Sequence, residues 1–176
     1  MEKSLKSVAS NYGLYLGAIL AVVSILTYAV NLGLFTEVWF GLTLMAIIIV
    51  MGIIAVAKVK QAQNGFASFK EAFTGFFITI IIGIAISTLV YFLIFNVIDT
   101  DAALVLKEKT IEKTVNILEG LNTPNEVIAK SVEQIESQNQ FGIANILKSL
   151  AINIVIYSII GLIVAAAMKR TKPDSQ

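Results

Sequence analysis

The chain has no cysteine and no histidine among its 176 residues. Without cysteine it can form no disulfide framework and offers no thiolate nucleophile. Without histidine it lacks the commonest general base and the commonest metal ligand of proteins. Charge is sparse and almost balanced, with 13 basic and 12 acidic residues and a net charge of +1. The broad positive surface of a nucleic-acid-binding protein is therefore missing, and we expect no nucleic-acid partner.

Charge is missing altogether from four long stretches. Residues 12–35, 38–57, 72–98 and 149–168 contain no Asp, Glu, Lys or Arg. Even the shortest has 20 residues, which is the length a helix needs to cross a bilayer core about 30 Å thick. None of them alternates between apolar and polar residues, as the strands of a membrane β-barrel do. We predict an all-α integral membrane protein in which a single domain, 1–176, crosses the membrane four times.

The first apolar stretch has some features of a secretory signal. Lys3 and Lys6 precede it, as basic residues precede the apolar region of a signal peptide. However, the uncharged run 7–36 is much longer than the roughly 7–15 residues of that region. We therefore expect the first stretch to be a retained membrane span.

The distribution of positive charge indicates which side of the membrane is cytoplasmic. Basic residues flank the spans at both chain ends and in the connection 58–71, whereas the first connection carries only Glu37. The segment 99–148 has five lysines but eight carboxylates, a net charge of −3. We expect a protein of the bacterial inner (cytoplasmic) membrane with both termini cytoplasmic and with 99–148 as a periplasmic insertion. The basic residues on the cytoplasmic side are then Lys3, Lys6, Lys58, Lys60, Lys70, Lys169, Arg170 and Lys172.

Turn and capping residues predict where the membrane helices begin and end. Gly33 is placed to end the first helix, and Thr36 to cap the second. Ser68 and Glu71 fit a capping box at the start of the third span, in which each side chain bonds the backbone amide of the other residue. Four phenylalanines here share one face, and we expect them to lie at the cytoplasmic headgroup level or to pack against the second span: Phe66, Phe69, Phe73 and Phe76.

The polar insertion has the pattern of a helical hairpin. An amphipathic helix over 102–119 ends at Gly120, and a second begins where Thr123 and Glu126 flank Pro124 as in another capping box. The apolar stripes of the two helices can pair with each other or with a partner, because a short helix alone in water is marginally stable. The stripes consist of Leu104, Ile111, Val115 and Leu118 on the first helix and Ile128, Val132 and Ile135 on the second.

The few polar residues of the spans form two layers when they are ordered by depth. Asn31, Asn96 and Asn153 fall near the outer ends of their spans, with Thr43 at a similar depth. These side chains either converge as a small polar pocket open to the outside or form hydrogen bonds across helices, each worth about 1 kcal/mol or less. The second layer lies near the midpoints of the first, third and fourth spans and consists of Ser24, Ser87 and Ser158.

Small residues recur at four-residue spacing on three of the spans. Such faces let helix backbones approach closely, which is how membrane helices associate. We therefore predict a tight core formed by the first, third and fourth spans, with the second span more exposed to lipid. The candidate packing residues are Gly13, Gly17, Ala21 and Ser24 on the first span, Gly83 and Ser87 on the third, and Ser158, Gly161 and Ala165 on the fourth.

The spans lack the side chains on which membrane enzymes and coupled transporters depend. Ion-coupled transport usually places Asp, Glu or His within the membrane, and these spans contain none. The chain also lacks the glycine motifs that bind nucleotides. In the insertion, carboxylates alternate with Lys107, Lys109 and Lys113, which is typical of a solvated helix face. We expect no catalytic residue, no metal ion and no cofactor, and hence a protein that is not an enzyme.

One motif opens the third span: Gly65-Phe66-Ala67-Ser68-Phe69-Lys70-Glu71-Ala72-Phe73-Thr74-Gly75-Phe76. Together with the order of two close spans, a third span, a polar insertion and a fourth span, it resembles a family of small membrane proteins found mainly in Bacteroidota, the domain-of-unknown-function family numbered 4199. The resemblance covers nearly the whole chain and implies an integral protein of the bacterial inner membrane. It implies no catalytic residues, because the family has no assigned activity.

These observations favour a protein that acts by interaction. Besides the lipid bilayer, its expected partners are a second copy of the chain or another protein of the cell envelope, bound through the packed helices, the hairpin or both. The alternative is a small transporter or channel subunit that uses the outer asparagine layer. That alternative requires an oligomer, because four helices alone leave little room for a pore.

Overall fold

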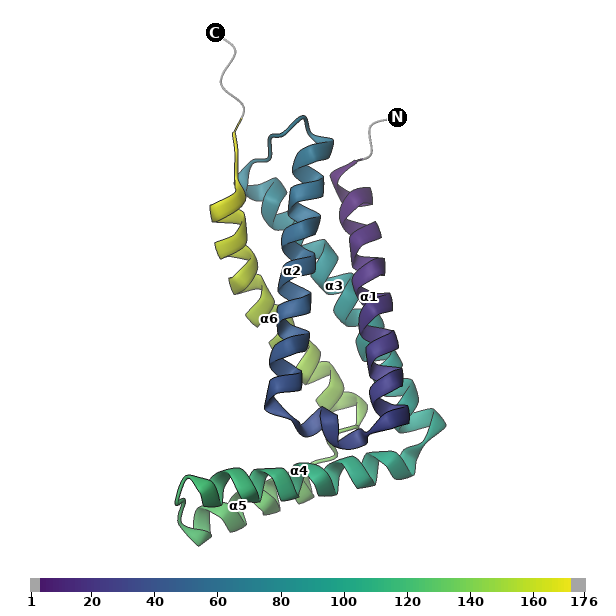
Figure 1. The fold of residues 1–176 in the computed structure, drawn as a ribbon, viewed down its shortest axis with the longest axis vertical. Coiled ribbons are helices and arrows are strands. Elements are labelled where there is room, and N and C mark those ends of the chain that lie inside the picture. Colours follow the sequence, from purple (N-terminus) through teal and green to yellow (C-terminus); the bar gives the residue numbers. More distant parts are fainter. Residues whose placement is uncertain (1–3, 172–176) are drawn as a thin grey trace.

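The computed structural model describes residues 4–171, and its regular structure there is helical. Four long helices run alongside one another, and a helical hairpin lies across one end of them (Figure 1). The long helices are α1 (Leu5–Val30), α2 (Val38–Ala62), α3 (Phe69–Leu93) and α6 (Ile143–Met168). Each is long and apolar enough to cross a membrane. The predicted all-α fold with four candidate spans is therefore confirmed.

Each of the four helices extends beyond its uncharged stretch at one end. α1 already begins at Leu5, and Lys6 lies in its first turn. α2 continues past Lys58 and Lys60 to Ala62. A helix can continue out of the apolar core in this way because the long lysine side chains reach water while their methylene groups stay in apolar surroundings.

The connection between α1 and α2 is a 3₁₀ turn, η1 (Leu32–Thr36). α1 ends before it because Asn31 has an extended backbone, and the Asn31 Oδ1 accepts a hydrogen bond of 2.9 Å from the Gly33 N–H. Glu37 occupies the N-cap position of α2, while the Thr36 hydroxyl donates to the Gly33 carbonyl oxygen at 2.8 Å. The predictions that Gly33 ends the first helix and that Thr36 caps the second are wrong, because these residues bond each other within the turn.

α3 is the central helix of the bundle. α1, α2 and α6 all pack against it, and α2 also contacts α1 and α6, whereas α1 and α6 do not contact each other within the described residues. The predicted core of the first, third and fourth spans is therefore wrong, because the first and fourth spans do not meet and the second is not set apart. A small-residue face indicates that a close approach is possible, but not which helix approaches.

Glycines determine the contact between α1 and α3. A Cβ atom added at Gly17 of α1 would lie 2.5 Å from Ile86 Cδ1, and one added at Gly83 of α3 would lie 2.5 Å from Leu16 Cδ2. Each helix therefore places large side chains over the glycines of the other. The two backbones can approach closely only because these positions carry no side chain.

Phe76 on α3 joins three helices. Its side chain is fully buried between Gly52 of α2 and Gly161 of α6, where an added Cβ atom would come within 2.4 Å and 2.7 Å of the ring. For Phe76, the expected packing against the second span is confirmed. The contact with α6 was not expected, since spacing along α3 cannot show that two glycines face the same ring.

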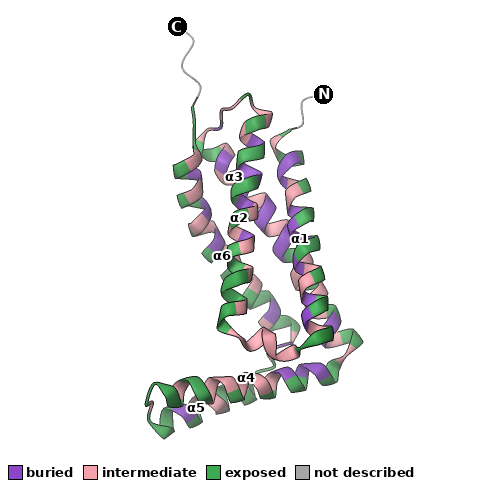
Figure 2. Ribbon diagram, viewed as in Figure 1, coloured by how far each residue is buried: buried purple, intermediate pink, exposed green. Residues whose placement is uncertain are grey.

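The outward faces of the four long helices are exposed and apolar, while their buried residues face one another (Figure 2). A helix bundle in water would carry polar and charged residues on these outward faces. This mostly apolar exterior fits a bundle surrounded by lipid, as in a multi-pass membrane protein. Exposed residues on these faces include Leu14, Val22, Leu42, Val50, Leu89, Ile159 and Ile163.

Helices α4 (Thr100–Gly120) and α5 (Asn125–Ser137) form the hairpin and pack against each other. The self-paired arrangement is therefore the one observed. Leu104 does not belong to the paired stripe, because its side chain is 62 % exposed. Leu106 is only 3 % exposed and faces the bundle instead.

Only one of the two predicted capping boxes forms. At the start of α3, Ser68 Oγ accepts from the Glu71 N–H at 3.3 Å, and the Glu71 carboxylate accepts from the Ser68 N–H at 2.8 Å. At the start of α5, Pro124 occupies the N-cap position and no side chain bonds the first amides. The box of Thr123 and Glu126 is therefore wrong, because the Thr123 N–H bonds back to the end of α4 and belongs to that turn.

The end of the bundle opposite the hairpin holds the start of α1, the end of α6 and the connection between α2 and α3 (Figure 1). Ala67 in that connection exchanges two backbone hydrogen bonds with Arg170, at 2.9 Å and 2.7 Å. The Arg170 guanidinium also lies 5.4 Å from the centroid of the Phe66 ring. Lys3 and Lys172, which we assigned to the cytoplasmic side, lie outside the described residues.

Candidate functional site

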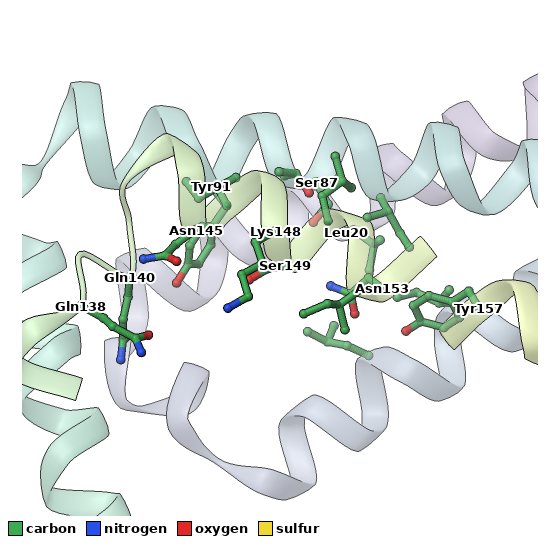
Figure 3. A pocket seen from close by; sticks show the side chains of 17 residues that line it. Leu20, Ser87, Tyr91, Gln138, Gln140, Asn145, Lys148, Ser149, Asn153 and Tyr157 are labelled. Carbon is green, nitrogen blue, oxygen red and sulfur yellow. The ribbon is translucent and has the colours of Figure 1, made fainter. Parts of the chain in front are cut away.

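An open cavity of about 560 Å³ lies between the long helices, towards the hairpin end of the bundle (Figure 3). α3 and α6 form most of its wall, and the connection between α5 and α6 lines the end next to the hairpin. Leu20 of α1 and Leu44 and Ile48 of α2 complete the lining. Four helices that are separate in the sequence thus contribute to one site.

The end of the cavity next to the hairpin is polar. The side chains of Lys148 and Asn153 on α6 extend into the open space between α6 and α2 (Figure 3). Lys148 is the only charged residue in the lining, and it has no ion-pair or hydrogen-bond partner among the described residues. The other polar lining residues are Gln138, Gln140, Asn145, Ser149, Ser87, Thr88, Tyr91 and Tyr157.

The inner end of the cavity is apolar and reaches the middle of the spans. Ile84 of α3 and Leu20 of α1 are both buried there. Among the described residues, no serine hydroxyl of the lining is hydrogen-bonded to Lys148, and no group of three or more carboxylates could hold a metal ion. A concave surface with a polar end and an apolar end is suited to binding an amphiphilic ligand.

A second, more polar cleft of about 470 Å³ separates α4 from η1 and the start of α2. Lys113 of α4 spans it, and its Nζ lies 2.8 Å and 2.9 Å from the two carboxylate oxygens of Glu37. This ion pair is the only one among the described residues. Since it joins the hairpin to the bundle, we assign the cleft a structural role.

Aromatic rings attach the hairpin to the bundle. Phe95 is buried at the end of α3, in a π-helical turn, η2 (Ile94–Ile98). Its ring centroid lies 4.6 Å from that of Tyr91, 5.2 Å from that of Phe141 and 5.8 Å from that of Phe35. Sequence analysis missed this cluster because its members come from the end of α3 and from connections far apart in the chain. Their common aromatic character was the only available signal.

A carboxylate outside the spans strengthens the same attachment. Asp99 accepts a hydrogen bond of 2.9 Å from the Ala102 N–H and one of 2.7 Å from the Tyr28 hydroxyl. The Ala102 amide, and after it the Tyr28 hydroxyl, lower the pKa of Asp99 below its ordinary value. Asp99 therefore stays charged while it caps α4 and holds it to α1.

The predicted outer asparagine layer does not form a common pocket. Asn31 lines the cleft beside α4, and Asn153 lines the cavity. Asn96 donates to the Phe92 carbonyl oxygen of its own helix at 3.2 Å, and the Thr43 hydroxyl likewise donates to Trp39 at 2.8 Å. Neither interpretation of the layer is correct, because sequence depth places residues at a level of the membrane without showing which way each helix turns them.

The three midplane serines also have separate environments. Ser24 is buried on α1, and Ser87 lines the cavity. The Ser158 hydroxyl donates to the Ile154 carbonyl oxygen of its own helix at 2.6 Å. Of the other candidate packing residues, Ala165 is fully buried in the core, whereas Ala21 is half-buried.

The family model for proteins of unknown function named DUF4199 matches residues 11–170. The chain belongs to this family. The match extends over the hairpin and over nearly all of the four spans, so the architecture described above is that of a DUF4199 protein, and the resemblance seen at the start of the third span is confirmed. No curated protein and no solved structure matches the chain. Any role for the residues of this DUF4199 protein therefore rests on its own geometry.

Proposed function

We propose that this DUF4199 protein is a non-enzymatic protein of the bacterial inner membrane that acts by binding another envelope protein through the α4–α5 hairpin. The observation that carries the proposal is that the hairpin exposes its carboxylates and covers most of its lysines. Only Lys130 is an exposed lysine on the two helices. The exposed carboxylates are those of Asp101, Glu108, Glu112 and Glu119 on α4 and Glu126, Glu133 and Glu136 on α5.

The covered lysines are engaged or packed within the structure. Lys113 is paired with Glu37, and the Lys107 Nζ donates to the Glu136 carbonyl oxygen at 2.6 Å. Lys109 is half-buried against η1, where its side chain lies 3.8 Å from the Cβ position of Gly33. The surface left to a partner is therefore acidic, although the sequence of the insertion alternates between charges.

An acidic surface favours a basic partner surface. A second copy of the chain presents the same carboxylates on the same side of the membrane, which disfavours pairing between two hairpins. The outward apolar faces of the spans remain available for self-association. These considerations support a different envelope protein as the partner of the hairpin.

The proposed orientation places both termini in the cytoplasm and the hairpin in the periplasm. Its support is that Lys58, Lys60, Lys70 and Arg170 lie at the end of the bundle opposite the hairpin, in accord with the positive-inside rule. Alkaline phosphatase fused after Gln138 should be active, and the same enzyme fused after Gln176 should be inactive. The reverse pattern would overturn the orientation.

Interaction can be tested by purifying the tagged full-length chain from native membranes in mild detergent. We expect a partner that co-purifies at low salt and is lost as salt is raised, because the screening length falls from about 10 Å at 0.1 M to about 3 Å at 1 M. Glu112→Gln with Glu119→Gln should weaken the association, and the corresponding lysine variant should abolish it. Recovery of a lone monomer, or of an equal amount of partner with the lysine variant, would contradict the proposal.

A small transporter or channel subunit is the second candidate, and the cavity is the observation that favours it. In this alternative the solute would enter through the cavity and not through a layer formed by the three asparagines. In proteoliposomes, replacing Asn153 with Leu should then reduce solute flux, whereas replacing Asn31 or Asn96 should not. If flux is unchanged in all three variants while the Glu112→Lys and Glu119→Lys variant loses the partner, the interaction function is favoured.

A further inference from the structure

We propose that the cavity between α2, α3 and α6 binds one anionic phospholipid from the leaflet on the hairpin side. The phosphate would lie beside Lys148, and an acyl chain would follow the apolar wall towards the middle of the bundle. This goes beyond the proposed function, because it concerns a different surface and a different class of ligand.

The depth of the cavity fits a lipid. Lys148 lies in the second turn of α6, and the first turn of α2 at the same end of the bundle carries Trp39, whose side chain is 57 % exposed. Exposed tryptophan of a membrane span characteristically lies at the headgroup level. The polar end of the cavity is therefore at the level where a lipid carries its phosphate.

The polar end also has the chemistry to hold a phosphate. Lys148 supplies an unpaired positive charge, which binds phosphate as a point charge. Ser149, Gln140 and Asn153 provide donors near it that form no hydrogen bonds with described residues, whereas the Asn145 amide is already bonded to Asn139. No carboxylate lines the cavity, so nothing in its wall repels an anion.

The apolar end has the length and composition to hold part of an acyl chain. From Lys148 to Tyr157 the wall formed by α6 extends about 13.5 Å at 1.5 Å per residue, and its part beyond Asn153 extends about 6 Å. Leu44, Ile48 and Ile84 line the same stretch from the other helices. A free phosphate ion would leave this half of the cavity unused, which favours a lipid over a soluble anion.

A gap between α2 and α6 provides a route from the bilayer. The two helices are held together around Phe76, which contacts Gly52 and Gly161. Towards the hairpin end, the cavity opens between them instead (Figure 3). A lipid can thus enter sideways from the surrounding leaflet without leaving the membrane.

The test is native mass spectrometry of the full-length protein released from nanodiscs of equal phosphatidylglycerol and phosphatidylethanolamine. We expect one bound phosphatidylglycerol per chain. Lys148→Ala should lower its enrichment about fivefold, the change produced by about 1 kcal/mol per lysine near an anionic surface. Lys148→Arg should retain it, and Lys130→Ala, which removes the exposed lysine of the hairpin, should leave it unchanged.

Thermal unfolding of each variant in detergent separates loss of the ligand from loss of the fold. Glycerol phosphate at millimolar concentration should not displace the lipid, and displacement would show that the site binds the anion alone. Equal occupancy by phosphatidylethanolamine, or unchanged enrichment in a folded Lys148→Ala variant, would overturn the proposal. Neither result bears on the acidic hairpin surface, so the interaction function is tested separately.

Discussion

The hydroxyl of Tyr28 donates a hydrogen bond of 2.7 Å to the carboxylate of Asp99. It joins the end of α1 to the start of α4, two points separated by 71 residues of sequence. The same carboxylate caps α4, so one side chain both begins the hairpin helix and attaches it to the bundle. The position of the hairpin across the bundle thus depends on a polar contact in addition to the aromatic rings around Phe95.

Replacing Tyr28 with Phe should raise the pKa of Asp99 towards its ordinary value. The native pKa is lowered, so the contribution of Asp99 to stability is fully present above the ordinary aspartate value of about 3.9 and is lost as pH falls through the lower native pKa. In the variant this loss should be smaller and should be complete at a higher pH, because the native pKa lies closer to the unfolded value. Titration of the Asp99 carboxyl carbon by NMR measures the shift, with Tyr15→Phe, on an exposed tyrosine, as the control. An unchanged pKa in Tyr28→Phe would show that the contact is not maintained in solution.

Gly83→Ala should destabilise the bundle by about 1–3 kcal/mol, the usual cost of overpacking. The added Cβ would lie 2.5 Å from Leu16, and the two helix backbones would have to separate. Gly41→Ala is the matched control, because no atom lies within 4 Å of its Cβ position. Unfolding in mixed micelles of mild detergent and SDS measures both variants, and the double variant with Leu16→Ala should lose less stability than the sum of the two single variants. Equal stability of the two glycine variants would mean that α1 and α3 are not closely packed.

Thr79→Val should lower stability by about 1 kcal/mol, in the range measured for hydrogen bonds between membrane helices. The fully buried hydroxyl donates to the Ala9 carbonyl oxygen of α1 at 3.0 Å as well as to its own helix, whereas valine keeps the shape and removes the donor. Thr43→Val should change little, because the Thr43 hydroxyl bonds only its own helix and is exposed. The same unfolding assay applies, and a similar effect of both variants would exclude a bond between helices.

Crosslinking can test the central position of α3, because the chain has no cysteine of its own. An added Cβ at Gly13 lies 2.7 Å from Ile82 Cβ, so a small separation brings a cysteine pair into the disulfide range of about 3.5–4.5 Å. Gly13→Cys with Ile82→Cys should therefore crosslink on oxidation. Ser24→Cys with Ser158→Cys should not, because α1 and α6 are not in contact. Efficient crosslinking of the second pair would require a different arrangement of the helices.

The spans could be predicted because the apolar core of the bilayer disfavours a charged side chain at every position of a span. The polar hairpin between the third and fourth spans was predictable for a related reason, since its two stripes have the helical period. Helix ends were less predictable. Ser68 and Glu71 form the capping box of α3, whereas Thr123 belongs to the turn after α4. Side chains and backbone carbonyls compete for the backbone amides at a helix end, and the sequence does not show which of them binds.

The cavity could not have been predicted from sequence. Lys148 lies just outside the uncharged stretch of the last span, and it reads there as an ordinary flanking lysine. In the structure Lys148 lines the same cavity as Leu44 and Ile84 of other helices, and no carboxylate belongs to that lining. The depth of a residue in the membrane can be counted along its own helix. The direction in which its side chain points is known only once the neighbouring helices are placed.

The sequence by itself determined that this is a helical membrane protein with four spans and a polar hairpin, because burial in lipid acts on each segment separately. Only the tertiary structure decided that α3 is central, that Asn31, Asn96 and Asn153 stay apart, and that the hairpin exposes its carboxylates. These features depend on which side chains of one helix fill the spaces on the surface of the next helix. Leu16 over Gly83 and Phe76 between Gly52 and Gly161 are contacts between helices, and the pattern along any single helix does not contain them.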